Sequence, residues 1–156
     1  MTGAAAAAGL ALILTACDLG QPHSFTARAE KNCASATRAI TADTPVTNPV
    51  AYAIDRFAQL DRVLVVVTTD RGFPGGPQGA TLHTAWIRPA RASLEAARPS
   101  LDRLRRVAGT PTVQRARLFA TAARAGDVGV RTAVLARLGL PRCAVLFNLP
   151  VPRVGS

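Results

Sequence analysis

The stretch from Phe25 to Ile40, FTARAEKNCASATRAI, shows the pattern that decides the fold class. Its apolar residues recur at spacings of three and four: Phe25, Ala29, Cys33, Ala36 and Ile40. An α-helix turns once every 3.6 residues, so this spacing gathers the five side chains on one face. The stretch predicts a helix with one buried face, and Cys33 lies on that face.

The same apolar period continues downstream of Asn48-Pro49, which is a typical helix start with an N-cap residue followed by proline in the first turn. The period extends to about Thr69. The segment from Arg62 to Thr69 is rich in β-branched valines and could instead form a buried strand. We favour the helix because the period enters this run unbroken. The apolar positions are Ala53, Phe57, Leu60, Leu64 and Val67.

A segment rich in glycine and proline, from Gly72 to Gly79, predicts an exposed connection between helices. It does not fit a phosphate-binding loop, because it has neither Gly-Lys-Ser/Thr nor G-x-G-x-x-G, and its prolines lack N–H donors.

From Ile87 to Ala108 a further helical period passes through Pro99. This predicts one kinked long helix, or two helices meeting at Pro99, with Pro89 near the start.

The remaining pattern predicts a helix from Thr110-Pro111 to Gly126 and a short last helix from an N-cap at Asp127 to Leu138. Gly139, Leu140 and Pro141 form a typical helix end. The apolar run 144–151 either caps the helices or lies against a membrane. The chain is therefore predicted to be all-α, a bundle of four or five helices over residues 25–143, followed by an apolar segment and tail over residues 144–156.

The N-terminus has the pattern of an export signal. An apolar run over residues 4–14 is too short to span a bilayer and has the length of a signal-peptide core. It ends in Leu14-Thr15-Ala16-Cys17, which resembles the bacterial lipobox. The resemblance implies removal of residues 1–16, diacylglycerol attachment at Cys17 and a polar tether over residues 17–24. The competing interpretation is a buried Ala-rich helix that ends in cysteine.

The net charge of +10 comes from 19 basic residues against nine acidic ones. Such a charge commonly indicates nucleic acid, but export and the few dispersed aromatic residues argue against that partner. Anionic lipids, wall polymers or another envelope protein fit an exported chain better. The candidate contacts lie in the C-terminal part, where Asp127 is the only acidic residue: Arg115, Arg117, Arg124, Arg131, Arg137 and Arg142.

With Cys17 acylated, Cys33 and Cys143 remain, and disulfides persist outside the cytoplasm. A bridge would close a loop of about 110 residues, which the chain-entropy model values at roughly 4 to 5 kcal/mol. The alternatives are two buried free thiols or metal ligands, and no second Cys or His lies at a useful spacing for a metal.

No catalytic motif is recognisable. His23 lies in the predicted tether, and His83 near Trp86 is best explained as a solvated side chain at a helix start. Asp55 and Asp61 do not share a helix face, and serines such as Ser93 and Ser100 lie outside any G-x-S-x-G motif. The sequence predicts no enzyme, cofactor or metal.

The lipobox, the early cysteine on a helix and the late Leu138-Gly139-Leu140-Pro141-Arg142-Cys143 are together similar to small helical lipoproteins of actinobacteria. The resemblance implies a helical fold and a disulfide but no activity. We therefore expect a lipid-anchored protein on the extracytoplasmic face of the cell membrane, acting as a non-catalytic binding or interaction module. The alternatives are an envelope enzyme whose site forms only in three dimensions, and a basic protein that is not exported.

Overall fold

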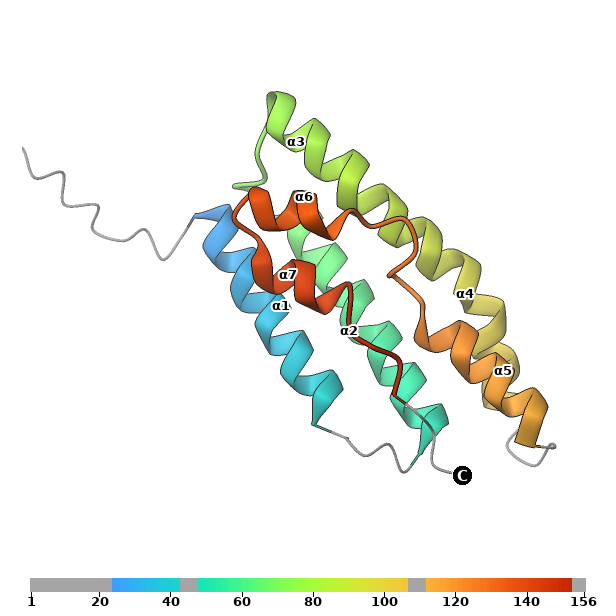
Figure 1. The fold of residues 1–156 in the computed structure, drawn as a ribbon. Helices are drawn as coiled ribbons and strands as arrows, with labels where there is room; N and C mark the ends of the chain where they lie inside the picture. The colour runs from blue at the N-terminus through green and yellow to red at the C-terminus, as the bar shows by residue number, and fades with distance from the viewer. Residues whose placement is uncertain (1–23, 43–47, 107–111, 153–156) are drawn as a thin grey trace, which may run out of the picture.

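The structure is a computed structural model that describes residues 24–42, 48–106 and 112–152 (Figure 1). Within these ranges every regular element is helical, which confirms the all-α class. The predicted signal segment, Cys17, most of the tether and the predicted helix boundary between Ala108 and Thr110 lie outside the described residues. The elements are α1 (Phe25–Thr41), α2 (Pro49–Thr69), α3 (Gly76–Leu82), the π-helix η1 (His83–Ile87), α4 (Arg88–Arg106), α5 (Thr112–Ala123), α6 (Thr132–Arg137) and α7 (Pro141–Leu146).

The helices α1 and α2 begin at side-chain caps and follow the predicted periods. Ser24 Oγ accepts a hydrogen bond from Ala27 N (3.2 Å), and Asn48 Oδ1 accepts from Val50 N and Ala51 N (both 3.1 Å). The buried residues of α1 are the five that the period predicts. The α2 helix extends to Thr69, so the helical interpretation of the valine run is confirmed.

The glycine- and proline-rich segment is not all loop, because α3 begins at Gly76 with Pro77 in its first turn. Proline has its φ angle preset for a helix and needs no partner for a first-turn N–H, so it starts the helix there. Gly79 lies against the backbone of Pro74, and a Cβ atom at Gly79 would collide with the Pro74 carbonyl oxygen. The predicted connection is therefore limited to the residues before Gly76.

Pro89 lies within a helix and not near its start, because α3, η1 and α4 are continuous. In η1 the register widens, and Arg88 N donates to His83 O. Pro89 has no N–H to offer to Ala85 O four residues earlier. Arg131 N, at the start of α6, donates to that oxygen instead (2.8 Å). The helix also continues through Pro99, so of the two predicted arrangements the single long helix is correct.

The C-terminal part differs from the prediction in two places. Residues 124–129 form turns and α6 begins only at Thr132, so Asp127 is not an N-cap. Gly139 ends α6 with φ +80°, as predicted, but Pro141 then starts α7, which the sequence pattern did not predict. With α3, η1 and α4 counted as one, the described residues form six helices, one more than the upper expectation.

The apolar run after Cys143 belongs to the core. Leu146 and Phe147 are buried, and the Phe147 ring meets the fully buried Trp86 edge-on at 5.7 Å. The core therefore extends past residue 143. The run was predicted either to cap the helices or to lie against a membrane, and the part that contains Leu146 and Phe147 caps the helices.

The helices pack as a bundle in which α1 lies beside α2, α2 contacts α4 and α5, and α4 lies beside α5 (Figure 1). The short α6 and α7 contact each other, and α7 also lies against α1. None of the helices in the described ranges is both long and apolar enough to cross a membrane.

Candidate functional site

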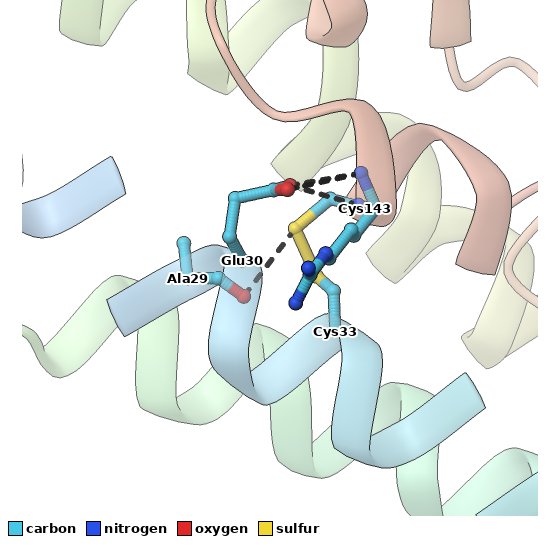
Figure 2. Close-up of a disulfide and its surroundings, with 5 residues drawn as sticks. Ala29, Glu30, Cys33 and Cys143 are labelled. Carbon is cyan, nitrogen blue, oxygen red and sulfur yellow. Dashed lines mark hydrogen bonds between the residues drawn. A yellow bond between two sulfur atoms is a disulfide. The ribbon is translucent and has the colours of Figure 1, made fainter. Parts of the chain in front are cut away.

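The disulfide between Cys33 and Cys143 joins α1 to α7 (Figure 2). The sulfur atoms are 2.08 Å apart, and both cysteines have no exposed surface. The predicted bridge is confirmed, and the alternatives of free thiols and metal ligands are wrong. Because the two residues are 110 positions apart, the bridge ties the first described helix to the last.

Glu30 supports the same corner, a role that its sequence context did not indicate. Its Oε1 atom accepts hydrogen bonds from Arg142 N (2.9 Å) and Cys143 N (3.2 Å), so the carboxylate caps the first turn of α7 (Figure 2). The free N–H groups of a helix N-terminus favour a negative charge at this position. The corner combines a covalent link with a charged cap and has a structural role.

A second missed interaction lies inside the bundle, where Arg56 of α2 is fully buried. Its Nη2 atom donates to Asp127 Oδ1 (3.0 Å), Asp127 Oδ2 (2.8 Å) and Leu149 O (3.3 Å). Its Nε and Nη1 atoms have no hydrogen-bond partner among the described residues. Burial raises the pKa of Asp127 to about 6, although the charge and hydrogen bonds of Arg56 act to lower it. Asp55, which precedes Arg56 in the sequence, is exposed. The local sequence therefore does not indicate that Arg56 is buried and paired with Asp127.

The predicted anion-contact arginines lie on α5, α6 and α7 and in the segment between α5 and α6. Those with described side chains are exposed and form no ion pair within the described ranges: Arg117, Arg124, Arg131, Arg137 and Arg142. Arg115 lies on α5, and its side chain lies outside the described residues. The only acidic residue of this part, Asp127, is engaged by Arg56. The described arginines of the C-terminal part therefore form no ion pair, although the Glu30 carboxylate lies against the backbone of Arg142.

An apolar groove of about 600 Å³ runs between α4 and α5. Most of its lining consists of small side chains, including Ala92, Ala96, Ala97, Ala120 and Ala125. Two lining hydroxyls already have partners: Ser93 Oγ accepts from Gly126 N (3.0 Å) and Thr121 Oγ1 donates to Arg117 O (3.1 Å). Arg124 is the one charged residue in the lining of this groove. The groove thus offers a methyl-lined surface with one cation.

The residues considered for catalysis are not brought together. His83 is exposed and its ring packs edge-on against Phe73 at 5.3 Å, whereas Trp86 is buried, so these two do not form a surface pair. His83 also lies inside the continuous helix and not at a helix start. Asp55 and Asp61 are both exposed on α2. In the part of the chain that the structure describes, no three His, Cys, Asp or Glu side chains cluster as metal ligands. His23 and Cys17 lie outside that part.

No protein-family model matches this chain, and no curated protein or solved structure matches it significantly.

Proposed function

We propose that this chain is a lipid-anchored protein of the extracytoplasmic membrane face and acts there as a non-catalytic binding module. The proposal joins the lipobox-like end at Cys17 to the properties of the helical domain. Its ligand or partner is an anionic group at the envelope: a lipid, a wall polymer or an acidic protein surface.

The observation that carries the proposal is the buried disulfide between Cys33 and Cys143. Structural disulfides form and persist in oxidising compartments and are rare in the cytosol. With these two cysteines paired inside the core, Cys17 is the one cysteine of the chain left for acylation. The cysteine inventory thus agrees with export followed by lipid attachment.

The charge distribution supports an anionic partner. The exposed arginines of α5 to α7 have no carboxylate partners within the described residues, and the bilayer surface lies within reach of a tethered domain. These arginines lie on several helices and in the turns between them, so they present positive charge on several elements of the domain.

Labelling with radioactive palmitate in a bacterial host tests the anchor. We expect the wild-type chain to incorporate palmitate and to fractionate with membranes, and Cys17→Ala to lose both properties. Cys33→Ala is the matched control, because it also removes one cysteine but leaves the proposed acylation site. A wild-type chain that takes up no label, or a Cys17→Ala variant that takes up as much as the wild type, would contradict the proposal.

A further inference from the structure

We propose that the groove between α4 and α5 binds the hydrocarbon chain of a single-chain fatty acid, with Arg124 pairing with its carboxylate. This deepens the proposed function by naming a ligand class. It rests on that function only for the location, the membrane surface, at which the chain encounters the fatty acid.

The lining of the groove selects an apolar chain. Ala92 and Ala96 on α4 and Ala120 on α5 present methyl groups to the groove. The hydroxyls of Ser93 and Thr121 are already bonded within the protein, so they do not require a polar ligand. A ligand without polar groups along its length brings no hydrogen-bonding group of its own that the methyl groups of the lining would leave unpaired.

The size of the groove suits a small ligand. Its volume of about 600 Å³ lies within the usual range of about 300–1,000 Å³ for ligand sites. From Pro89 to Ala97 the α4 backbone rises about 12 Å at 1.5 Å per residue. An extended hydrocarbon chain lying along α4 contacts the lining from Pro89 to Ala97 over this length.

The charge at the groove selects the ligand's head group. Arg124 directly follows the last residue of α5, is exposed and has no ion pair within the described ranges, and Arg117 lies seven residues earlier, on α5. A guanidinium group binds a carboxylate through two parallel hydrogen bonds. A second copy of this chain is disfavoured in the groove, because its own arginines would face these two and each chain carries a net charge of +10.

The test uses the full chain with Cys17→Ala, so that no attached lipid competes, and the fluorescent fatty acid cis-parinaric acid as the probe. We expect saturable binding with one site per chain. Ala96→Phe fills the groove and is expected to weaken binding at least tenfold. Arg124→Gln is expected to weaken binding of the acid about tenfold through loss of the charged pair, and to leave binding of the uncharged methyl ester unchanged.

Matched controls are Ala58→Phe, which adds the same ring at an exposed position of α2, and Arg137→Gln, which removes the same charge from α6. Both are expected to bind within twofold of the parent chain. Absence of saturable binding, unchanged binding by Ala96→Phe, or equal losses in Arg124→Gln and Arg137→Gln would overturn the proposal. So would a dimer, detected by light scattering, that Ala96→Phe dissociates.

The two proposals fail separately. Fatty-acid binding by the Cys17→Ala chain does not depend on acylation, and palmitate labelling at Cys17 does not depend on the groove. Palmitate labelling without fatty-acid binding in the groove would contradict the proposed ligand and would still support the proposed lipid anchor.

Discussion

At the scale of single residues, the pair of Arg56 and Asp127 is the strongest electrostatic feature of the interior. The guanidinium has no exposed surface, whereas the Asp127 side chain keeps 22% of its surface exposed. Removing a charge from water costs several kcal/mol, and only a partner with good geometry offsets that cost. Asp127 supplies two acceptor atoms to one nitrogen, and Leu149 O supplies a third. The pair fixes α2 against the turns before α6.

The raised pKa of Asp127 predicts how stability changes with pH. Burial moves the pKa from 3.8 in the unfolded chain to about 6 in the fold. Between these values the folded state holds a proton that the unfolded state has released, so stability falls as pH rises from about 4 to about 6. Over the full window the expected loss is about 3 kcal/mol, at 1.36 kcal/mol per pKa unit.

Urea denaturation at several pH values measures this effect. Asp127→Asn removes the titrating group, so we expect the wild type to lose stability relative to the variant between about pH 4 and about pH 6, with no further change above pH 6. Asp102→Asn, at a half-exposed carboxylate of α4, is the control. If the variant instead lost stability relative to wild type as pH rises, Arg56 and not burial would dominate the Asp127 pKa.

At the scale of elements, two helix boundaries are set by groups from other helices. The α6 start is held by Arg131 N, which donates to the Ala85 carbonyl that Pro89 leaves without a partner. The α7 start is held by Glu30 of α1. Both α6 and α7 are short, and isolated helices of this length are not stable in water. They therefore exist because the bundle supplies partners for their first N–H groups.

Removing the Glu30 cap is expected to destabilise the fold. Glu30→Ala leaves the N–H groups of Arg142 and Cys143 without their acceptor, and loss of a cap costs about 0.5–2 kcal/mol. Glu30→Gln keeps an acceptor oxygen and is expected to cost less than Glu30→Ala. Urea denaturation gives the free energies of unfolding, with Glu95→Ala on the exposed face of α4 as the control. Equal stabilities of Glu30→Ala and wild type would show that water replaces the cap.

At the scale of the whole molecule, the disulfide sets the connection between the two ends of the described chain. Both cysteines lie in the core, with Cys143 beside the Ala29 carbonyl. A cross-link over 110 positions removes many conformations from the unfolded chain and does little to the fold itself. The bridge therefore stabilises the bundle mainly through the unfolded state.

Reduction of the bridge is expected to lower the free energy of unfolding by about 4 kcal/mol, within the range of about 2–5 kcal/mol for native disulfides. Urea denaturation with and without a phosphine reductant measures it, in a Cys17→Ala background that prevents exchange with the third thiol. Under non-reducing conditions the intact mass should be two hydrogens below that of the reduced form. Equal masses would show that the thiols are free in solution.

The helices with long apolar periods could be predicted because their signals are local. The period from Phe25 to Ile40, the Asn48 cap and the Gly139 helix end each depend on residues within a few positions of one another. Backbone conformation and the buried face of a helix respond to such short-range patterns. The cysteine pairing was also predictable, because the proposed acylation of Cys17 leaves only Cys33 and Cys143 to pair.

The remaining features depend on residues far apart in the chain. Asp127 has the residue type of an N-cap, but it pairs with Arg56, 71 positions away, and Glu30 caps a helix 112 positions downstream. Pro89 remains inside a helix because Arg131 satisfies the carbonyl that it frees. The groove forms only where α4 and α5 bring their alanines together. Local patterns specified which segments of this chain become helices, and tertiary packing specified which groups contact one another. The physical reason is that a buried polar group without a hydrogen-bond partner costs free energy, so these groups pair with residues that only the fold brings close.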